Sequence, residues 1–339
     1  MHEPAFINQS PFFAQPVPFL DRGGRDCRVV VVKASYGLQA GELSLAEEQR
    51  PIRFGDELWG DPEVPDIKYP ADLCETKPGT DVAFVAQACA PAGHQVRSMD
   101  VQLQVADRRQ VLHVVGPRNW ERGLSGRVLP GQPQPFQAVP LSWGNAWGGS
   151  DHSKPEKPKQ ELRNPVGSGV ARSMGTLIGT PAYQIESPRL MGGDRHQKAT
   201  PIGCAPIGRS FEPRRKWAGT YDDAWLNKVY PAKPKDYNDR FENCAGPDWW
   251  FETPLEGGEP VGLTGVTPEG MVQFRIPRVR VVIDARIDGE LTTQRPPLDT
   301  VLIDTIEGVV ELVWRATFVC PAKLRDRFTL LRVKKKDFR

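Results

Sequence analysis

The alternation of apolar and polar positions predicts strands at both ends of the chain. In residues 279–287, apolar side chains take every second position and Arg280 and Asp284 fall between them, with only Val282 out of step. This period of two is typical of a strand with one face on a core and the other in solvent. The Asp288-Gly289 pair that follows favours a tight hairpin turn.

Further strands follow the same rule. In VVELVWRATF, every second residue from Val310 to Phe318 shares one face, and Glu307-Gly308 predicts a second hairpin with the preceding LDTVLIDT. Residues 99–105 also alternate, and VLHVV returns after a short polar link. CRVVVVKASY is apolar on both faces, which is typical of a central strand, and DVAFVAQAC predicts one more strand.

These strands predict a mainly β fold, an antiparallel β-sandwich-like core of two packed sheets with few short helices. Two sheets are expected because a single sheet would leave one hydrophobic face in water. The strand-rich parts, residues 20–115 and 261–320, are expected to form a single domain over residues 1–322.

The stretch between them, residues 116–260, is a loop-rich insertion. It holds 18 of the 33 prolines and 19 of the 32 glycines, but also seven of the nine tryptophans. Disordered segments are poor in aromatic residues, so the tryptophans predict an ordered excursion that packs onto the strands. Within it, Thr220 and Asp223 resemble a capping box, which predicts a short helix from Tyr221 to Val229.

Composition narrows the class of protein. The 339 residues are 39% hydrophobic, enough for a sizeable core, and the formal net charge of +2 does not indicate nucleic acid or a membrane surface as a partner. No apolar run reaches the roughly 18 residues that a membrane span needs, and the N-terminus lacks the features of a signal peptide. Six scattered cysteines without a CxxC motif are expected to be reduced, so we expect a cytoplasmic protein.

Charge is unevenly distributed. Residues 323–339 carry eight basic and two acidic side chains, a local net charge of +6. We interpret this stretch as a basic C-terminal tail outside the domain, either a solvated terminus or an electrostatic dock for an acidic partner.

The sequence carries none of three common catalytic motifs. The chain has no GxSxG, HExxH or GxxxxGK[ST] motif, and its five histidines are too scattered to suggest a shared metal. We therefore expect no enzymatic activity, no metal and no cofactor. In SWGNAWGGSDH, the adjacent Asp151 and His152 are not expected to form a dyad, because neighbouring side chains point apart.

Three aspartates are instead expected to order loops. Asp151 follows two glycines, where aspartate accepts backbone hydrogen bonds. Asp81 follows a Pro-Gly turn in KPGTDV, and Asp222 is explained by helix capping.

Aromatic residues of the insertion are the candidates for partner binding. Trp143 and Trp147 fit either a groove wall or a core that anchors the loop, and the adjacent Trp249 and Trp250 are the best candidates for exposure. The full candidate set is Trp143, Trp147, Trp217, Tyr221, Trp225, Trp249 and Trp250.

Several strings in order resemble a bacterial family of unknown function, number 2169, found beside type VI secretion genes. The likeness runs from about residue 6 to residue 319. Each string alone is weak, and the eight in order carry the resemblance. They are WGD at Trp59, KPGTDV at Lys77, WGGSD at Trp147, NPVGSG at Asn164, API with the later PRRKWAGTYDDAW from Ala205 to Trp225, DRFENCAGPD at Asp239, GGEPVGLTGVTPEG at Gly257 and LDTVLIDTIEGVVELVWR at Leu298.

The resemblance implies a cytoplasmic adaptor or chaperone that helps to load a type VI effector, often one linked to a PAAR domain, onto the VgrG spike. It implies no catalytic residues. A second hypothesis, from another class, is a carbohydrate-binding or glycoside-hydrolysing β-sandwich with an aromatic-lined groove and Asp151 and Asp222 as its acids.

Overall fold

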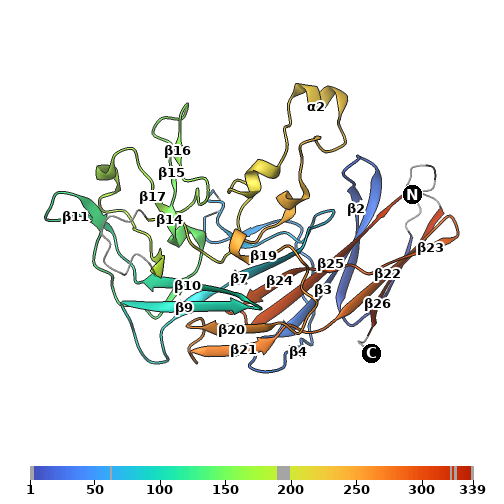
Figure 1. Ribbon diagram of the computed structural model, residues 1–339, viewed down its shortest axis with the longest axis horizontal. Helices are drawn as coiled ribbons and strands as arrows, with labels where there is room; N and C mark the ends of the chain where they lie inside the picture. The colour runs from blue at the N-terminus through green and yellow to red at the C-terminus, as the bar shows by residue number, and fades with distance from the viewer. Residues whose placement is uncertain (1–3, 62, 189–198, 321–322, 324–326, 337–339) are drawn as a thin grey trace.

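The alternating segments of the sequence form the strands of three larger sheets around one apolar core (Figure 1). The computed structural model describes residues 4–61, 63–188, 199–320, 323 and 327–336. The prediction of a mainly β, sandwich-like fold is confirmed, although one large sheet faces two smaller ones.

The central sheet has seven strands. Its order is β19-β7-β24-β25-β3-β2, with β4 beside β3; β7 and β24 pair in parallel and the other neighbours antiparallel. The strand predicted to be central, β3, lies between β25 and β2. The strands are β2 (Phe13–Leu20), β3 (Asp26–Gly37), β4 (Ser44–Leu45), β7 (Thr80–Val85), β19 (Trp250–Phe251), β24 (Leu298–Asp304) and β25 (Val309–Val319).

Two smaller sheets lie against it. The five-stranded sheet is antiparallel, in the order β18-β10-β9-β20-β21, and the four-stranded sheet has the order β1-β26-β22-β23. The strands of the first are β9 (Ser98–Val105), β10 (Arg108–Val115), β18 (Ile185–Glu186), β20 (Pro260–Thr264) and β21 (Met271–Arg275). Those of the second are β1 (Ala5–Gln9), β22 (Arg280–Ile287), β23 (Glu290–Gln294) and β26 (Phe328–Lys336).

Both predicted hairpin turns are present. Asp288 and Gly289, with φ of 53° and 83°, join β22 to β23, and such positive values at both central residues are what a type I′ turn requires. Gly308, with φ of 67°, ends the turn between β24 and β25.

One continuous core joins the three sheets. Every second residue of β25 points into it, as the alternation predicted, and so does one of the two apolar faces of β3, while the other sheets add their own apolar side chains. Representative buried contributors are Val32 of β3, Phe84 of β7, Leu103 of β9, Leu263 of β20 and Ile283 of β22. Because β3 and β25 are covered on this face by both smaller sheets, no face of the sandwich is left apolar and wet.

The insertion, residues 116–260, folds as short strands and 3-10 turns packed on this core.

DVAFVAQAC, which precedes the insertion and was predicted as one strand, divides into β7 and the short β8. Strand β8 pairs with β13 instead of entering the large sheet. The short strands are β5 (Glu57–Leu58), β6 (Ile67–Tyr69), β8 (Gln87–Cys89), β11 (Trp120–Arg122), β12 (Val128–Pro130), β13 (Ala138–Pro140), β14 (Trp147–Gly148), β15 (Ser150–Asp151), β16 (Lys159–Gln160) and β17 (Ser168–Gly169).

Helical segments are few and short, as predicted. They are η1 (Trp143–Asn145), η2 (Met174–Leu177), η3 (Arg214–Trp217), α2 (Asp223–Lys228), η4 (Asp239–Glu242) and η5 (Pro247–Trp249). Within the described ranges, no helix combines the length and apolar character needed to cross a bilayer.

Helix α2 begins later than predicted and has a different cap. Asp222 is its N-cap, and the Asp222 carboxylate accepts a hydrogen bond from the Trp225 backbone N–H at 2.8 Å. Thr220, predicted to be the cap, instead donates its hydroxyl to Asp236 at 2.8 Å. A carboxylate one turn ahead of Trp225 therefore replaced the hydroxyl in the capping role.

The prediction of a separate basic tail is wrong for residues 328–336, which form β26. This strand lies between β1 and β22, and its Leu331 and Val333 side chains are fully buried in the core. Its basic residues alternate with these apolar ones, so the period of two outweighs the local charge. Lys334 is 2.7 Å from Asp284 of β22, which also pairs with Arg332. The rest of residues 323–339, apart from 323 and 327, lies outside the described residues.

The role of β26 can be tested by comparing two substitutions. Leu331→Ala should lower the free energy of unfolding by about 2–5 kcal/mol, because it leaves a cavity in the core. Lys336→Gln, at an exposed position of the same strand, should change it by less than about 0.5 kcal/mol. Urea unfolding followed by fluorescence measures both. Equal, small effects would show that this strand does not contribute to the core.

Candidate functional site

Residues 217–238 form an arm that projects from the body of the protein, with α2 near its end (Figure 1). Its base is fastened to the turn between β2 and β3. The Arg22 backbone carbonyl accepts from the Lys233 N–H at 3.0 Å, and the Arg22 guanidinium donates to the Tyr237 carbonyl at 2.8 Å. Across the arm, the Asn238 N–H donates to the Trp217 carbonyl at 3.0 Å. The arm is therefore closed at its base by backbone hydrogen bonds.

Aromatic side chains gather near the end of the arm. The Trp225 ring lies edge-to-face with Tyr221, at 4.7 Å between centroids, and with Tyr230, at 5.8 Å. Tyr221, Tyr230 and Leu226 are 54%, 65% and 56% exposed, although they are large and apolar. We call Tyr221, Trp225, Leu226 and Tyr230 the aromatic tip.

Local hydrogen bonds fix the orientation of Trp225 within the aromatic tip. The Asp222 cap holds its backbone N–H, and its indole N–H donates to the Ala232 carbonyl at 2.9 Å. The Tyr230 backbone N–H donates to the Trp225 carbonyl at 3.0 Å. Tyr221 and Trp225, both predicted to bind a partner, are thus brought together on a short, cross-bonded loop.

Trp217 and Trp250 meet below the arm. The Arg240 guanidinium lies 4.4 Å from the Trp250 ring centroid and 5.8 Å from that of Trp217, so the cation is shared between the two rings. Trp250 also donates its indole N–H to the Pro78 carbonyl at 2.7 Å. Both rings are half-buried and join the arm to the edge of the central sheet.

Trp143 and Trp249, both predicted to contact a partner, are almost fully buried, although both line a pocket of about 500 Å³. They are 6% and 1% exposed, and each packs edge-to-face on another ring, Phe211 and Phe84 respectively. Trp143 therefore follows the alternative in which it anchors the loop in the core. Trp147 is half-buried and packs beside Trp120 in a separate small cluster. Of the adjacent pair 249–250, only the second ring reaches the surface.

Asp151 lies in β15 on an exposed loop. Its carboxylate accepts from the backbone N–H groups of Ser153, at 2.9 Å, and Arg172, at 2.7 Å. These hydrogen bonds, with that from the Ser153 hydroxyl as the largest contribution, lower the pKa of Asp151 to about 2. His152 is exposed, and no hydrogen bond joins it to Asp151 within the described contacts. A carboxylate with so low a pKa is poorly suited to accept a proton at neutral pH.

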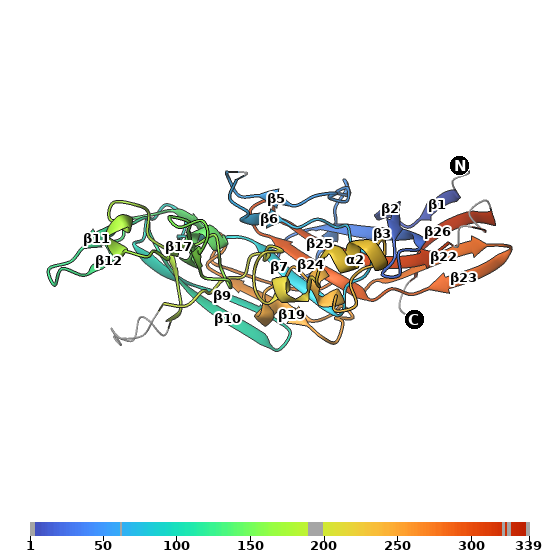
Figure 2. The ribbon, with the colours of Figure 1, turned by 90° about the horizontal axis from the view of Figure 1, so that it is seen from above.

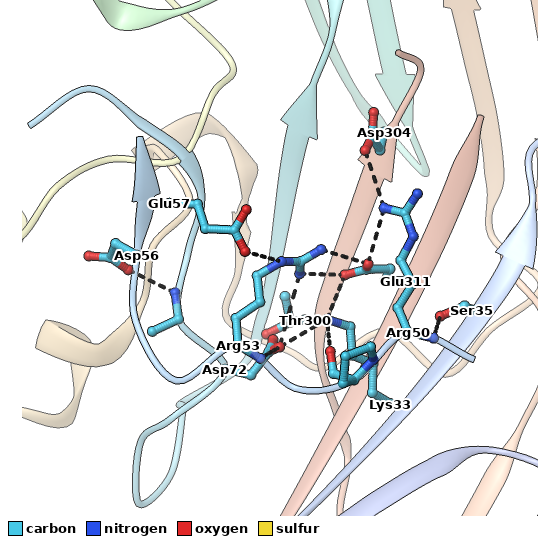
Figure 3. A network of polar contacts seen from close by, with 12 residues as sticks. Lys33, Ser35, Arg50, Arg53, Asp56, Glu57, Asp72, Thr300, Asp304 and Glu311 are labelled. Atoms are coloured by element: carbon cyan, nitrogen blue, oxygen red, sulfur yellow. Dashed lines mark hydrogen bonds and ion pairs between the residues drawn. The ribbon is translucent and has the colours of Figure 1, made fainter. Parts of the chain in front are cut away.

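Charged side chains converge on the outer face of the central sheet, away from the apolar core (Figure 3). Lys33 of β3 lies 2.9 Å from the Asp72 carboxylate and 3.0 Å from that of Glu311 in β25. The Arg53 guanidinium donates to both Glu311 oxygens, at 2.7 and 2.8 Å. Burial alone would raise the pKa of Asp72, but Lys33 and Arg315 hold it below its ordinary value.

Other ion pairs extend this cluster along the same face. Arg315 of β25 is paired with Asp299, and Arg50 lies 3.5 Å from Asp304. Asp304 also accepts from the Tyr69 hydroxyl at 2.6 Å, and burial with this neighbouring carboxylate raises the pKa of Tyr69. A surface pocket of about 650 Å³ opens beside these groups, lined in part by Arg50 and Tyr69.

Asp81 is fully buried in β7 and binds a distant loop. Its carboxylate is 2.8 Å from the Lys77 ammonium and accepts from the Cys244 backbone N–H, at 2.7 Å, and the Asn243 amide, at 3.0 Å. Burial would raise the pKa of Asp81, but Lys77 and these donors hold it below its ordinary value. Burial would lower the pKa of Lys77, but the Asp81 carboxylate raises it.

The charged side chains around Lys33 and Asp81 lie close together, as ionisable groups do in a catalytic site, but each is paired with a group of opposite charge. Five basic residues, Lys33, Arg50, Arg53, Lys77 and Arg315, are matched by five acids, Asp72, Asp81, Asp299, Asp304 and Glu311. We call these ten residues the ionic cluster. Carboxylates held by cations on several sides fix chain segments and are poor proton acceptors.

The sequence carried a signal for this cluster that the strand analysis missed. Lys33 interrupts an otherwise apolar run, and Glu311 and Arg315 fall between the apolar positions of VVELVWRATF. Charged side chains on one face of a buried strand indicate that this face either contacts solvent or is covered by residues of opposite charge. Lys33 and Glu311 pair with each other and also with Asp72 and Arg53 from residues 50–81, and no local pattern indicates the pairing with that distant segment.

The Lys77–Asp81 pair gives a test with a definite sign. Lys77→Met leaves Asp81 buried without its cation and should lower the free energy of unfolding by about 3–5 kcal/mol near pH 7. The wild-type pair contributes fully above the ordinary Asp pKa of about 3.9, and its contribution is lost as the pH falls through the lower native value. In the variant, burial raises the Asp81 pKa, so moving from pH 7 to pH 5 should recover part of the loss.

The control for this experiment removes both charges. Lys77→Met combined with Asp81→Asn should be less destabilising than Lys77→Met alone, because no buried charge is left unpaired and the new amide oxygen still accepts from the Cys244 N–H. Unfolding in urea at both pH values measures each variant. A deficit in Lys77→Met that is the same at pH 7 and pH 5 would contradict a buried, ionised Asp81.

Comparison with known protein families gives one match. Residues 23–315 match the family described as "Uncharacterized protein conserved in bacteria (DUF2169)". The matched range includes the central sheet from β3 to most of β25, the ionic cluster and the arm. No curated protein and no solved structure matches the chain. Since the match covers most of the 339 residues, the chain belongs to the DUF2169 family.

Proposed function

We propose that the protein is a non-enzymatic adaptor that holds a protein partner through the aromatic tip. The observation that carries this proposal is the exposure of Tyr221, Leu226 and Tyr230 at the end of a projecting arm. Exposed apolar side chains grouped in this way mark interaction sites on soluble proteins. Tyrosine and tryptophan are also the residues that most often dominate the binding energy of protein interfaces.

The arm is built to bind without first being ordered. Its base is hydrogen-bonded to residue 22, its helix is capped by Asp222, and the Trp225 indole is held by the Ala232 carbonyl. Binding therefore freezes few additional torsions, which lowers the entropic cost of association. The same contacts keep the two tyrosine rings on either side of Trp225, so a partner meets one preformed surface.

The proposed partners follow from the resemblance to proteins encoded beside type VI secretion genes. We propose a type VI effector, one linked to a PAAR domain, as the protein held by the arm, and loading onto the VgrG spike as the outcome. The adaptor would act in the cytoplasm and need no cofactor. The mutual neutralisation of the ionic cluster and the low pKa of Asp151 support a role without catalysis.

Isothermal titration calorimetry tests this proposal. It measures binding of the purified protein to the effector and to the VgrG spike protein whose genes lie nearest to the gene of this protein. Tyr221→Ser combined with Tyr230→Ser should weaken binding to the effector by about 100-fold, because two anchors of about 1–2 kcal/mol or more each are lost. Phe54→Ser is the matched control, since Phe54 is a similarly exposed ring outside the arm. It should leave the affinity within about twofold.

Thermal melting should show both variants folded, since the replaced rings are exposed. Binding of neither protein by the wild type would overturn the adaptor assignment. Equal affinity of wild type and arm variant would move the contact away from the aromatic tip. Binding of an oligosaccharide that is lost in Trp225→Ala would favour the carbohydrate-binding hypothesis instead.

A further inference from the structure

A polar pocket lies where three segments meet at the outer face of the central sheet. It is lined by Glu75 and Thr76, by residues 294–297, which lead from β23 to β24, and by Arg315 and Thr317 of β25. Its volume is about 400 Å³, which is typical of small-molecule sites and far above the roughly 30 Å³ that one water molecule takes up. The pocket therefore has room for a ligand larger than a bridging water.

Hydrogen bonds join the walls of this pocket to one another. The Arg315 Nε donates to the Asp72 carbonyl at 3.0 Å, and the Thr317 hydroxyl donates to the Glu75 carbonyl at 2.6 Å. On the other side, the Gln294 amide donates to the Thr317 carbonyl at 2.8 Å. The three segments are thus held together before any ligand binds.

Two side chains of the lining each have a buried atom without a hydrogen-bond partner among the described residues. One atom is Nη2 of Arg315, whose side chain is 2% exposed, and the other is Oε2 of Glu75. The first is a donor and the second is an acceptor. A buried polar atom is costly to leave unpaired, so a ligand that accepts from Arg315 and donates to Glu75 removes both costs.

The charges at the pocket favour a ligand with two ends of opposite sign. Arg315 is already paired with Asp299, but Arg295 is exposed and has no ion pair within the described part of the chain. Both guanidinium groups line the pocket and can donate to one carboxylate. Lys233 of the arm lies 3.8 Å from Oε2 of Glu75, beyond hydrogen-bond distance. Burial raises the pKa of Glu75 in spite of this lysine, so its carboxylate lacks a close cationic donor.

We propose that this pocket binds a free α-amino acid. The ligand carboxylate accepts from Arg295 and from Nη2 of Arg315, and the ligand ammonium donates to Oε2 of Glu75. An ammonium is favoured over a hydroxyl at Glu75 because hydrogen bonds between charged groups are stronger than neutral ones. An inorganic anion would bring a negative charge close to Glu75 without a donor to compensate for it. The pocket is separate from the aromatic tip, and the inference does not depend on the proposed adaptor function.

Saturation-transfer NMR with the full-length protein tests the class of ligand. An equimolar mixture of the protein amino acids should give saturable signals, and the tightest binder is then titrated beside two analogues. The hydroxy-acid analogue replaces the ammonium by a hydroxyl, and the amide analogue replaces the carboxylate by a neutral amide. The amino acid should bind at least about tenfold more tightly than either analogue, because each analogue loses one charged hydrogen bond. Absence of saturable binding, or equal affinity for the hydroxy acid, would overturn the assignment.

Removing one arginine tests the carboxylate end of the pocket. Arg295→Gln should weaken binding of the amino acid and of its hydroxy acid by about tenfold, since both present a carboxylate, and should leave binding of the amide analogue within about twofold. The matched control is Arg127→Gln, which removes the same charge at an exposed position between β11 and β12. The control should bind all three ligands as the wild type does. An equal loss in both variants would show only a general effect of net charge and would overturn the site.

Glu75→Gln tests the ammonium end and separates binding from structure. The substitution keeps the size of the side chain and removes its charge. It should weaken binding of the amino acid and of the amide analogue by about tenfold, without weakening binding of the hydroxy acid. An equal loss for all three ligands would show that the pocket had lost its shape and would overturn the role of Glu75. The arm variant Tyr221→Ser/Tyr230→Ser should bind the amino acid normally, so failure of the pocket and failure of the proposed adaptor function are distinguishable.

Discussion

Burial of both faces of the central sheet is the constraint on which the rest of the structure depends. One face of β3 and β25 is apolar and is covered by the two smaller sheets. The other face carries Lys33, Glu311 and Arg315, which cannot be buried without partners. Residues 50–81 supply Arg53 and Asp72 to these charges, and Ile52 packs with Val31 and Val313 on the same face, so both ion pairs and apolar contacts hold this connection.

The same chemistry positions the candidate site. Asp81 of the central sheet holds the loop at Cys244, and the Pro78 carbonyl holds the Trp250 indole, so the end of the insertion is fastened to β7. Trp249 and Phe84 then close the core beneath this loop. Because both ends of the arm are fixed near the sheet, the apolar side chains near its end project outward from a fixed backbone. A preformed contact surface needs such a fixed backbone.

The arm presents an exposed apolar surface near its end. The aromatic tip is exposed and held by local hydrogen bonds around Trp225. Figure 2 shows the sheets arranged in one flattened, elongated body, and the arm is fastened to this body at Arg22.

The sequence by itself determined the strands, the central place of β3 and the hairpin turns, because the period of two and turn residues such as Asp288-Gly289 act locally. It also indicated that the tryptophan-rich insertion packs on the core. Only the tertiary structure decided that Trp249 is buried while Tyr221 is exposed, that basic β26 enters a sheet, and that Lys33 meets Asp72 and Glu311. These outcomes depend on contacts between residues distant in the chain, and neither periodicity nor composition encodes which distant segment covers a given face.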